Sequence, residues 1–313
     1  MYARVAFVTR RLLVVPALAA VLLAGCTSAQ HVAGSPETPA VTSTSAVATT
    51  AATTTTAAAR STVPRSTPAR SSAPTTTAVR VPPPPVAVPN VSYPPGSGPL
   101  VVLNPGHNGG NASHEAEIAQ PVPAGFGEYK ACDTTGTNTV SGYTEHAFNW
   151  DVTLRVRAIL QAHGVRVVLT RPNDTGVGPC VDQRAAIGNA PGVAAVISIH
   201  SDGTASGAGQ GFHVCEDSRP PAGAAVAAQS HALTVAVHDA LLHGSGLGTS
   251  TYIGRNGYYP RSDLAGLNLA VRPATFLELG NMRNASDAAL LTSATGRARI
   301  AAAVAAGILA YLG

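Results

Sequence analysis

The sequence predicts an α/β fold over residues 98–313, as a single three-layer domain with a mainly parallel twisted sheet flanked by helices. Short apolar runs rich in Val, Ile and Leu alternate there with longer segments whose apolar residues recur at helical spacing. The apolar runs are nearly continuous, which is typical of strands buried on both faces of a sheet. About 215 residues are ample for one hydrophobic core, and we find no internal repeat. These observations favour one domain over two.

The expected strands are short and apolar. In chain order they cover residues 99–104, 165–170, 193–200, 210–215 and 274–279. The first clear helix is predicted at 145–162, with Thr144 as a natural N-cap and Gly164 as a natural stop. Its apolar stripe comprises Phe148, Val152, Val156, Ile159 and Leu160. Further helices are predicted at about 181–189, 222–243 and 284–311.

The segment 108–144 is different in character. It is rich in Gly, Thr and Asn and is too long for an ordinary connection between a strand and a helix. Loops of this length are usually functional or mobile. We expect a long loop that borders a functional site.

The chain begins with a segment typical of exported proteins. A basic start precedes an apolar run from Leu12 to Leu23, which is too short to favour a membrane span. The run ends in Leu23–Ala24–Gly25–Cys26, which resembles a bacterial lipobox, whose cysteine is lipidated and becomes the first residue of the mature protein. We predict a lipoprotein-type signal peptide over residues 1–25 and lipidation at Cys26. An ordinary secretory leader is the alternative.

Residues 26–97 have a composition that does not predict a folded domain. They consist largely of Thr, Ala, Ser, Pro and Val, with a proline run at 82–85. Such a segment cannot bury enough apolar surface to offset the entropy lost on folding. We predict a disordered, partly polyproline tether, open to O-glycosylation, that would reach from the membrane to the cell wall.

The basic isoelectric point, about 9.0, does not describe the predicted domain. Seven of the 20 basic residues but only one of the 16 acidic residues lie in residues 1–97. The remainder therefore carries 13 basic and 15 acidic residues, a formal charge of −2. Because it also has no basic run, we expect no nucleic-acid partner.

Three cysteines follow Cys26. An exported protein meets an oxidising compartment, so one pair is expected to form and one thiol to remain free. Cys132 and Cys180 lie in Gly/Thr/Pro-rich loops, whereas Cys215 lies in a strand-like run. Because loop cysteines have the freedom to meet, we predict a Cys132–Cys180 disulfide.

Four polar residues recur at the ends of predicted elements. His107 follows the first strand and its turn, Glu145 opens the first helix, and His200 and Glu278 end later strands. Ligands of a parallel α/β sheet bind at the carboxyl ends of its strands, so these side chains are expected on one rim. Two histidines and one carboxylate, with a fourth position left open, are typical of catalytic zinc.

Each of these residues also has a structural explanation. His107 fits a turn, Glu145 is a favourable charge at a helix N-terminus, and His200 fits a satisfied histidine near a sheet end. Glu278 is hardest to explain in this way, because an unpaired carboxylate in an apolar strand is costly to bury. The metal site therefore depends on the four residues taken together.

Several ordered motifs now carry a family resemblance. They are Asn104–Gly109, Tyr143–His146, Leu169–Asp174, Asp182–Arg184, Ser198–Asp202 and Leu277–Asn281. Through them residues 98–312 resemble the zinc-dependent N-acetylmuramoyl-L-alanine amidases of the amidase_3 type, and among these the mycobacterial members. Family members often have Asp at the position of Asn104 and Lys at that of His146, and neither residue is a metal ligand.

The resemblance implies a role for each of the four residues. His107, Glu145 and His200 would bind one Zn²⁺, and Glu278 would be the catalytic carboxylate. The paired loop cysteines also look like those of the mycobacterial members, which supports the Cys132–Cys180 pairing.

Other polar residues near the motifs leave alternatives open. Arg171 and Arg184 are candidates for holding a substrate carboxylate through bidentate hydrogen bonds, and structural salt bridges are the equal alternative. Further candidates are His114 and His146 as alternative ligands, and Tyr252, Tyr258 and Tyr259 as lining of a sugar or peptide groove.

The implied reaction is hydrolysis of the amide between N-acetylmuramic acid and L-alanine of the peptidoglycan stem peptide. Zinc would polarise the scissile carbonyl and acidify a water, and Glu278 would carry the proton. A zinc peptidase acting within the stem peptide is one alternative, and a non-catalytic, lipid-anchored peptidoglycan-binding module is another. We expect an exported monomer that meets peptidoglycan or muropeptides at the outer face of the membrane or in the wall.

Overall fold

The computed structural model describes residues 87–313. The predicted signal peptide, Cys26 and most of the predicted tether lie outside the described residues. Just before the first strand, the Tyr93 hydroxyl donates a hydrogen bond to the Ile187 carbonyl over 3.0 Å. Arg166 likewise donates to the carbonyls of Pro94 and Gly98. These contacts attach the segment before the first strand to the domain.

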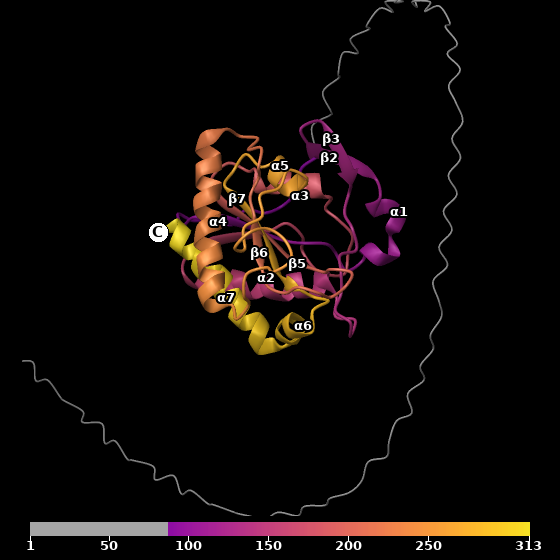
Figure 1. The fold of residues 1–313 in the computed structure, drawn as a ribbon. Coiled ribbons are helices and arrows are strands. Elements are labelled where there is room, and N and C mark those ends of the chain that lie inside the picture. Colours follow the sequence, from indigo (N-terminus) through magenta and orange to yellow (C-terminus); the bar gives the residue numbers. More distant parts are fainter. Residues whose placement is uncertain (1–86) are drawn as a thin grey trace, which may run out of the picture. The chain divides into compact units, whose positions relative to one another are not determined.

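Five strands form the central sheet, in the order β4-β1-β5-β7-β6 (Figure 1). They are β1 Leu100–Pro105, β4 Arg166–Leu169, β5 Val193–Asp202, β6 His213–Cys215 and β7 Ala274–Asn281. β1 pairs in parallel with β4 and β5, and β5 pairs in parallel with β7. Only β6 runs antiparallel, along the outer side of β7. The mainly parallel sheet is confirmed.

Helices cover both faces of this sheet. One face packs against α2 Glu145–Ala162, α4 Ala224–Gly244 and α7 Ala294–Leu312, and the other against α3 Val181–Gly188 and α5 Ala265–Asn268. Alternation along β1 explains both contacts, since Val101 and Leu103 join the first apolar cluster while Leu100 and Val102 join the second. The three-layer architecture is therefore confirmed.

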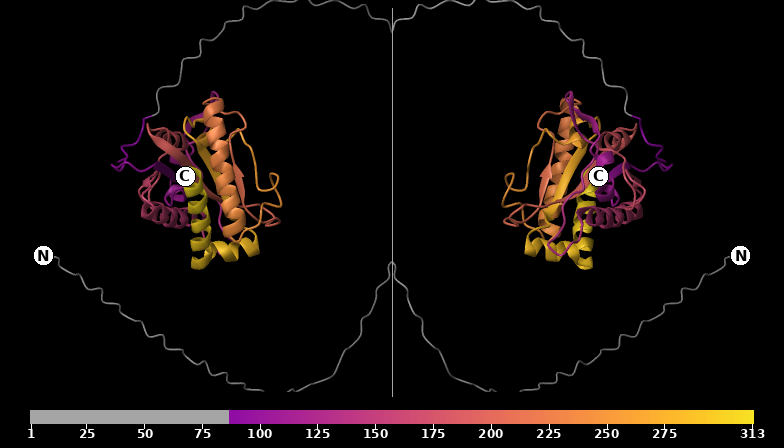
Figure 2. Two further views of the ribbon diagram at one scale, coloured as in Figure 1. Left: turned by 90° about the vertical axis from the view of Figure 1, so that its left-hand side faces the viewer. Right: turned by 90° about the vertical axis from the view of Figure 1, so that its right-hand side faces the viewer.

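The C-terminal helix α7 is long and apolar enough to cross a membrane by length and composition. It instead packs beside α4 and α2 within the domain, and Figure 2 shows α4 and α7 side by side. A Cβ on Gly307 would lie 2.5 Å from the Val237 Cα, so the two helices approach closely there. In this domain α7 is a core helix.

Two sequence-based expectations need correction. The helix predicted at 284–311 is two helices, α6 Ala285–Thr292 and α7. Ser293 separates them, because its side chain accepts a hydrogen bond from the Gly296 N–H and caps α7.

The segment 108–144 is also more structured than a loop. It contains a 3-10 turn at Asn111–Ser113, α1 Glu115–Ile118 and a hairpin of β2 Pro121–Gly125 and β3 Glu128–Ala131. Gly125, Phe126 and Gly127 all have positive φ, which makes the tight hairpin turn. Two prolines in β2 conceal the strand pattern in the sequence.

Candidate metal centre and catalytic site

The fold brings the four predicted residues to one edge of the sheet. His200 and Glu278 lie opposite each other on β5 and β7. His107 follows β1, the other neighbour of β5, and Glu145 is the first residue of α2. All four line one cavity of about 390 Å³. Its wall includes Lys130, Ala131 and residues 133–137, so the segment 108–144 borders the site as expected.

Three of the four residues form a compact donor set. The His107 Nε2 lies 3.2 Å from the Glu145 Oε1, and the His200 Nδ1 lies 2.9 Å from the same oxygen. One donor atom from each residue lies within 4.8 Å of the other two. Two ligands of one tetrahedral zinc ion are about 3.4 Å apart, given bonds of about 2.1 Å. The donor set therefore fits a single zinc-sized ion.

Glu145 is held by backbone and side-chain donors. Its Oε2 accepts a hydrogen bond from the Thr137 N–H over 3.0 Å, and its Oε1 accepts from Asn149 Nδ2 and the Ser201 N–H over 3.3 Å each. Burial opposes ionisation of this carboxyl, but His107 and His200 outweigh burial and hold the pKa of Glu145 well below its usual range. Glu145 is therefore a fixed, ionised carboxylate.

His107 owes its place to an unusual backbone. Its φ is 57°, in the left-handed region that few residues other than glycine adopt. Directly before it, a Cβ on Gly106 would lie 2.0 Å from the His200 ring, so only glycine lets the turn approach that close. The His200 ring in turn stacks on Phe276 at 4.3 Å. Backbone geometry and packing thus set both imidazoles.

The site shifts the pKa values of the two histidines in opposite directions. For His107, burial lowers the pKa, but the carboxylates of Glu145 and Asp133 outweigh it and raise the pKa to about 10. For His200, burial outweighs Glu145 and lowers the pKa. A cation would compete directly with protons for these nitrogens.

Glu278 lies beside the donor set and outside it. Its Oε2 is buried and has no hydrogen-bond partner among residues 87–313. Burial, together with the negative charges of Glu145 and Asp202, raises the pKa of Glu278 well above its usual range. A buried carboxylate whose oxygen is free and whose pKa is raised is suited to take up and release a proton.

The two arginines that are candidates for substrate binding donate their hydrogen bonds to groups of the protein itself. Arg171 is 1% exposed, and its guanidinium donates to Asp174 and to carbonyls that include that of Pro105. Arg184 is 3% exposed and donates to the Pro105 and His107 carbonyls and to Asp133. These contacts favour the structural alternative, in which both arginines hold the turn after β1.

The other candidate residues are engaged elsewhere. His146 Nδ1 pairs with Asp174 at 2.9 Å, and His114 Nδ1 bonds the Gly110 carbonyl. Tyr252 donates to Asp202, while Tyr258 stacks on His238. Among the described residues only His107, Glu145 and His200 form a His/Cys/Asp/Glu group able to hold a metal.

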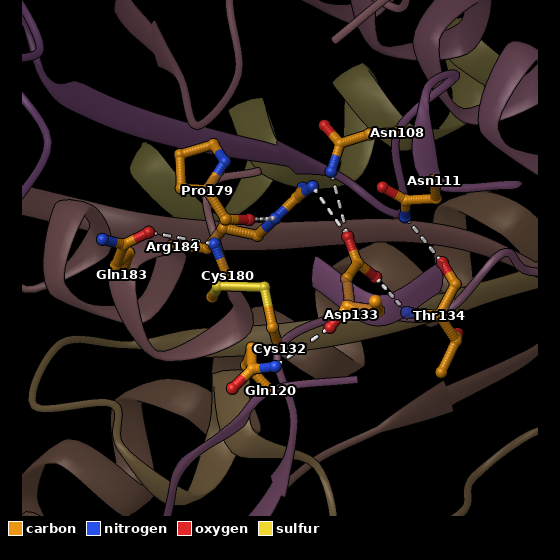
Figure 3. The surroundings of a disulfide bond; sticks show 11 residues. Asn108, Asn111, Gln120, Cys132, Asp133, Thr134, Pro179, Cys180, Gln183 and Arg184 are labelled. Carbon is orange, nitrogen blue, oxygen red and sulfur yellow. Dashed lines mark hydrogen bonds and ion pairs between the residues drawn. A yellow bond between two sulfur atoms is a disulfide. The ribbon is translucent and has the colours of Figure 1, made fainter. Parts of the chain in front are cut away.

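The structure joins Cys132 and Cys180 in a disulfide (Figure 3). Among the described cysteines Cys215 is free, and it is buried in β6. The disulfide lies one residue from Asp133, which contacts both His107 and Arg184. The predicted pair therefore connects the start of α3 to the segment that supports the donor set.

Sequence reasoning missed the residues that support the donor set. They are Asp133, Thr134, Thr137, Asn149 and Phe276. Two of them act through backbone atoms, which leave no signal in the sequence. Asn149 does carry one, because it lies one helical turn after Glu145 on the same face of α2.

The fold and the site together have the architecture of a hydrolase, with a donor set that could hold a metal at the carboxyl ends of parallel strands and a carboxylate beside it. A family model described as Amidase_3, N-acetylmuramoyl-L-alanine amidase, matches residues 101–310. The chain belongs to this family.

Mycobacterial proteins are among its relatives. The chain is 47% identical over 210 residues to the N-acetylmuramoyl-L-alanine amidase Rv3717 of Mycobacterium tuberculosis, a match that covers 67% of this chain and 85% of that protein. It is also similar to crystal structures of the amidase Ami1 from Mycobacterium smegmatis and, in its apo form, from Mycobacterium abscessus. Each is 47% identical with a TM-score of 0.65 and covers 69% of this chain, and the match covers 98% and 100% of those chains, respectively.

Proposed function

We propose that this protein is a zinc-dependent amidase that hydrolyses the bond between N-acetylmuramic acid and L-alanine of peptidoglycan stem peptides. One observation carries the proposal: a His–Glu–His donor set and a carboxylate with a free oxygen share one cavity. Family membership supplies the substrate class.

His107, Glu145 and His200 would hold one Zn²⁺, because their donor atoms lie close enough to share an ion and the set leaves a fourth position open. When bound, zinc supplies a Lewis acid that polarises the scissile carbonyl and lowers the pKa of water. Glu145 brings a negative charge that favours the cation.

Glu278 would move the proton. As a carboxylate it would take a proton from the attacking water, and as the acid it would give that proton to the departing alanine amine. Its raised pKa stabilises the protonated form between these two events. Its Oε2 has no competing partner, so it remains available to both groups. No side chain needs to form a covalent intermediate.

The test combines two variants with two readouts. Glu278→Gln keeps the side-chain size and should lose most hydrolysis of purified muropeptide while binding zinc stoichiometrically. His107→Ala should lose both zinc and activity. Unchanged hydrolysis by Glu278→Gln, or stoichiometric zinc in His107→Ala, would contradict the assigned roles. Asp287→Asn is the control, because the buried Asp287 carboxylate accepts hydrogen bonds from the backbone N–H groups of Gly211 and Asn281 and lies outside the donor set.

The products distinguish this reaction from its alternatives. An amidase releases an intact stem peptide that begins with L-alanine, whereas a peptidase within the stem releases shorter fragments. Mass spectrometry of the digest separates the two. A non-catalytic binding module would retain muropeptide without turnover and would not hold metal tightly.

The proposal also includes export of the protein and its anchoring to the membrane through a lipid on Cys26. The leader and the lipobox-like tetrad at Cys26 support a lipoprotein at the outer face of the membrane, with the tether spanning toward the wall. Metabolic labelling with a fatty acid should mark the full-length protein and spare Cys26→Ala. Size-exclusion chromatography with light scattering tests the expected monomer.

A further inference from the structure

The segment from Cys132 to Thr137 lies directly against the donor set. The Thr137 N–H bonds the Glu145 carboxylate, and the Thr134 carbonyl lies 2.9 Å from His107 Nδ1. The carboxylate of Asp133 lies beside the same nitrogen, with Oδ1 3.3 Å from His107 Nδ1. Asp133 is 6% exposed, although an unpaired carboxylate is costly to bury. Arg184 pairs with this carboxylate and offsets the cost of its burial.

The two ring nitrogens of His107 have separate surroundings. Nε2 faces Glu145 at 3.2 Å, on the side of the donor set. Nδ1 faces away, toward Asp133 and the Thr134 carbonyl. A nitrogen that binds a metal carries no proton, so the proton of a ligating His107 must be on Nδ1. The Asp133 carboxylate and the Thr134 carbonyl can only accept, and the Thr134 hydroxyl, 3.3 Å from Nδ1, can accept as well, so these neighbours favour that tautomer.

Asp133 is itself fixed in place. Its Oδ1 accepts a hydrogen bond from the Thr134 N–H over 2.8 Å, and its Oδ2 accepts from Asn108 Nδ2 over 3.0 Å and from Arg184 Nη2 over 3.3 Å (Figure 3). Arg184 also donates to the His107 carbonyl over 3.0 Å. The carboxylate is thus tied to the same turn that carries His107.

The chain on the other side of Asp133 is anchored as well. Cys132, the preceding residue, forms the disulfide to Cys180, and its N–H donates to the Gln120 carbonyl over 2.8 Å. The Val181 N–H donates to the Cys132 carbonyl over 2.8 Å. Side-chain and backbone bonds therefore leave the Asp133 carboxylate little freedom to turn away from His107.

We propose that Asp133 is a positioning residue that fixes the tautomer and ring orientation of His107 for metal binding. The inference depends on the proposed function, because it assigns Asp133 a purpose only if His107 binds zinc. Partners of this kind, which bond the far nitrogen of a ligating histidine, typically contribute 10- to 100-fold to metal affinity.

The test measures zinc affinity by competition with a chromogenic chelator. Asp133→Ala should weaken zinc binding by about 10- to 100-fold. Asp133→Asn keeps an oxygen acceptor of the same size and should fall between Asp133→Ala and the native protein. Asp287→Asn is the matched control, since Asp287 is 5% exposed and contacts none of the three proposed ligands. Its zinc affinity should not change.

A spectroscopic readout separates positioning from general structure. The zinc-loaded native protein should show a downfield imidazole N–H proton resonance that is absent in His107→Ala. This resonance should shift in Asp133→Asn and stay in place in Asp287→Asn. If Asp133→Ala does not fold, the Asp133→Asn affinity and spectrum decide alone.

Two results would overturn the inference. One is native zinc affinity in both Asp133 variants, and the other is an equal loss in Asp287→Asn. Failure of the proposed function is distinguishable from either, because it would appear as a native protein that binds no zinc or does not hydrolyse muropeptide.

Discussion

Replacing Gly136 by alanine should disrupt the donor set from outside it. Gly136 has a φ of +74°, and a Cβ there would lie 2.7 Å from the Glu145 Oε2 and 2.8 Å from the His107 Cδ2. An ordinary contact needs about 3.4 Å, so either the new Cβ or the ligands must move by about 0.7 Å. Metal–ligand distances tolerate only about ±0.2 Å. We therefore expect a loss of zinc affinity of at least tenfold.

The same substitution also strains the backbone, and Gly142→Ala isolates that part. Gly142 has a φ of +89° in the same segment, but a Cβ there would meet nothing within 4 Å. Both variants should lose about 1–2 kcal/mol of unfolding free energy from the left-handed backbone. Only Gly136→Ala should lose zinc and hydrolysis. Equal zinc affinity in the two variants, measured by chelator competition, would refute the reasoning.

Three further predictions test other parts of the domain. Replacing both Cys132 and Cys180 by serine opens a loop with a sequence separation of 48. The free energy of unfolding should fall by about 4 kcal/mol, which is about 8–16 °C in Tm, and zinc binding should weaken. The control variant Cys215→Ala should keep native zinc affinity. In chelator-treated protein, Glu278→Gln should have a larger free energy of unfolding than the native protein at pH 7 and an equal one near pH 4. The reason is that the pKa of Glu278 is raised in the folded state, so the native protein has its full stability below the unfolded pKa and loses stability as the pH rises. A stability difference that does not change with pH in denaturant titrations would contradict this. Adding zinc at 100 times its Kd should stabilise the native protein by about 2.7 kcal/mol and leave the melting curve of His200→Ala unchanged.

The sequence predicts the sheet and its helices well, because the signal there is periodic. The helix predicted at 145–162 has the observed bounds of α2, and the five strands lie where apolar runs place them. The prediction fails where local chemistry overrides the pattern. Ser293 interrupts a continuous apolar helix by capping α7, and two prolines conceal strand β2 in the segment 108–144.

The candidate site, like the fold, is predicted in part. The four residues at element ends are predicted because parallel strands bring their carboxyl ends together. Much of the support for those residues is not predicted, because it comes from the irregular residues 133–137. The shortest contact of Thr134 with His107 is through its carbonyl, which every residue type offers, and Thr137 acts through its N–H, which every residue type except proline offers. No side-chain pattern can report such contacts.

Contacts with the turn after β1 explain why Arg171 and Arg184 are buried. Together Arg171 and Arg184 donate hydrogen bonds to the carbonyls of Pro105, Gly106 and His107, at the end of β1 and in the turn after it. Buried carbonyls need donors, and a guanidinium offers five. Arg184 further joins this turn to Asp133. The turn from one side and residues 132–137 from the other therefore hold His107 between them, and residues 133–137 also line the cavity. Because one segment both supports the proposed ligands and lines the cavity, we expect changes there that alter substrate fit to alter metal affinity as well.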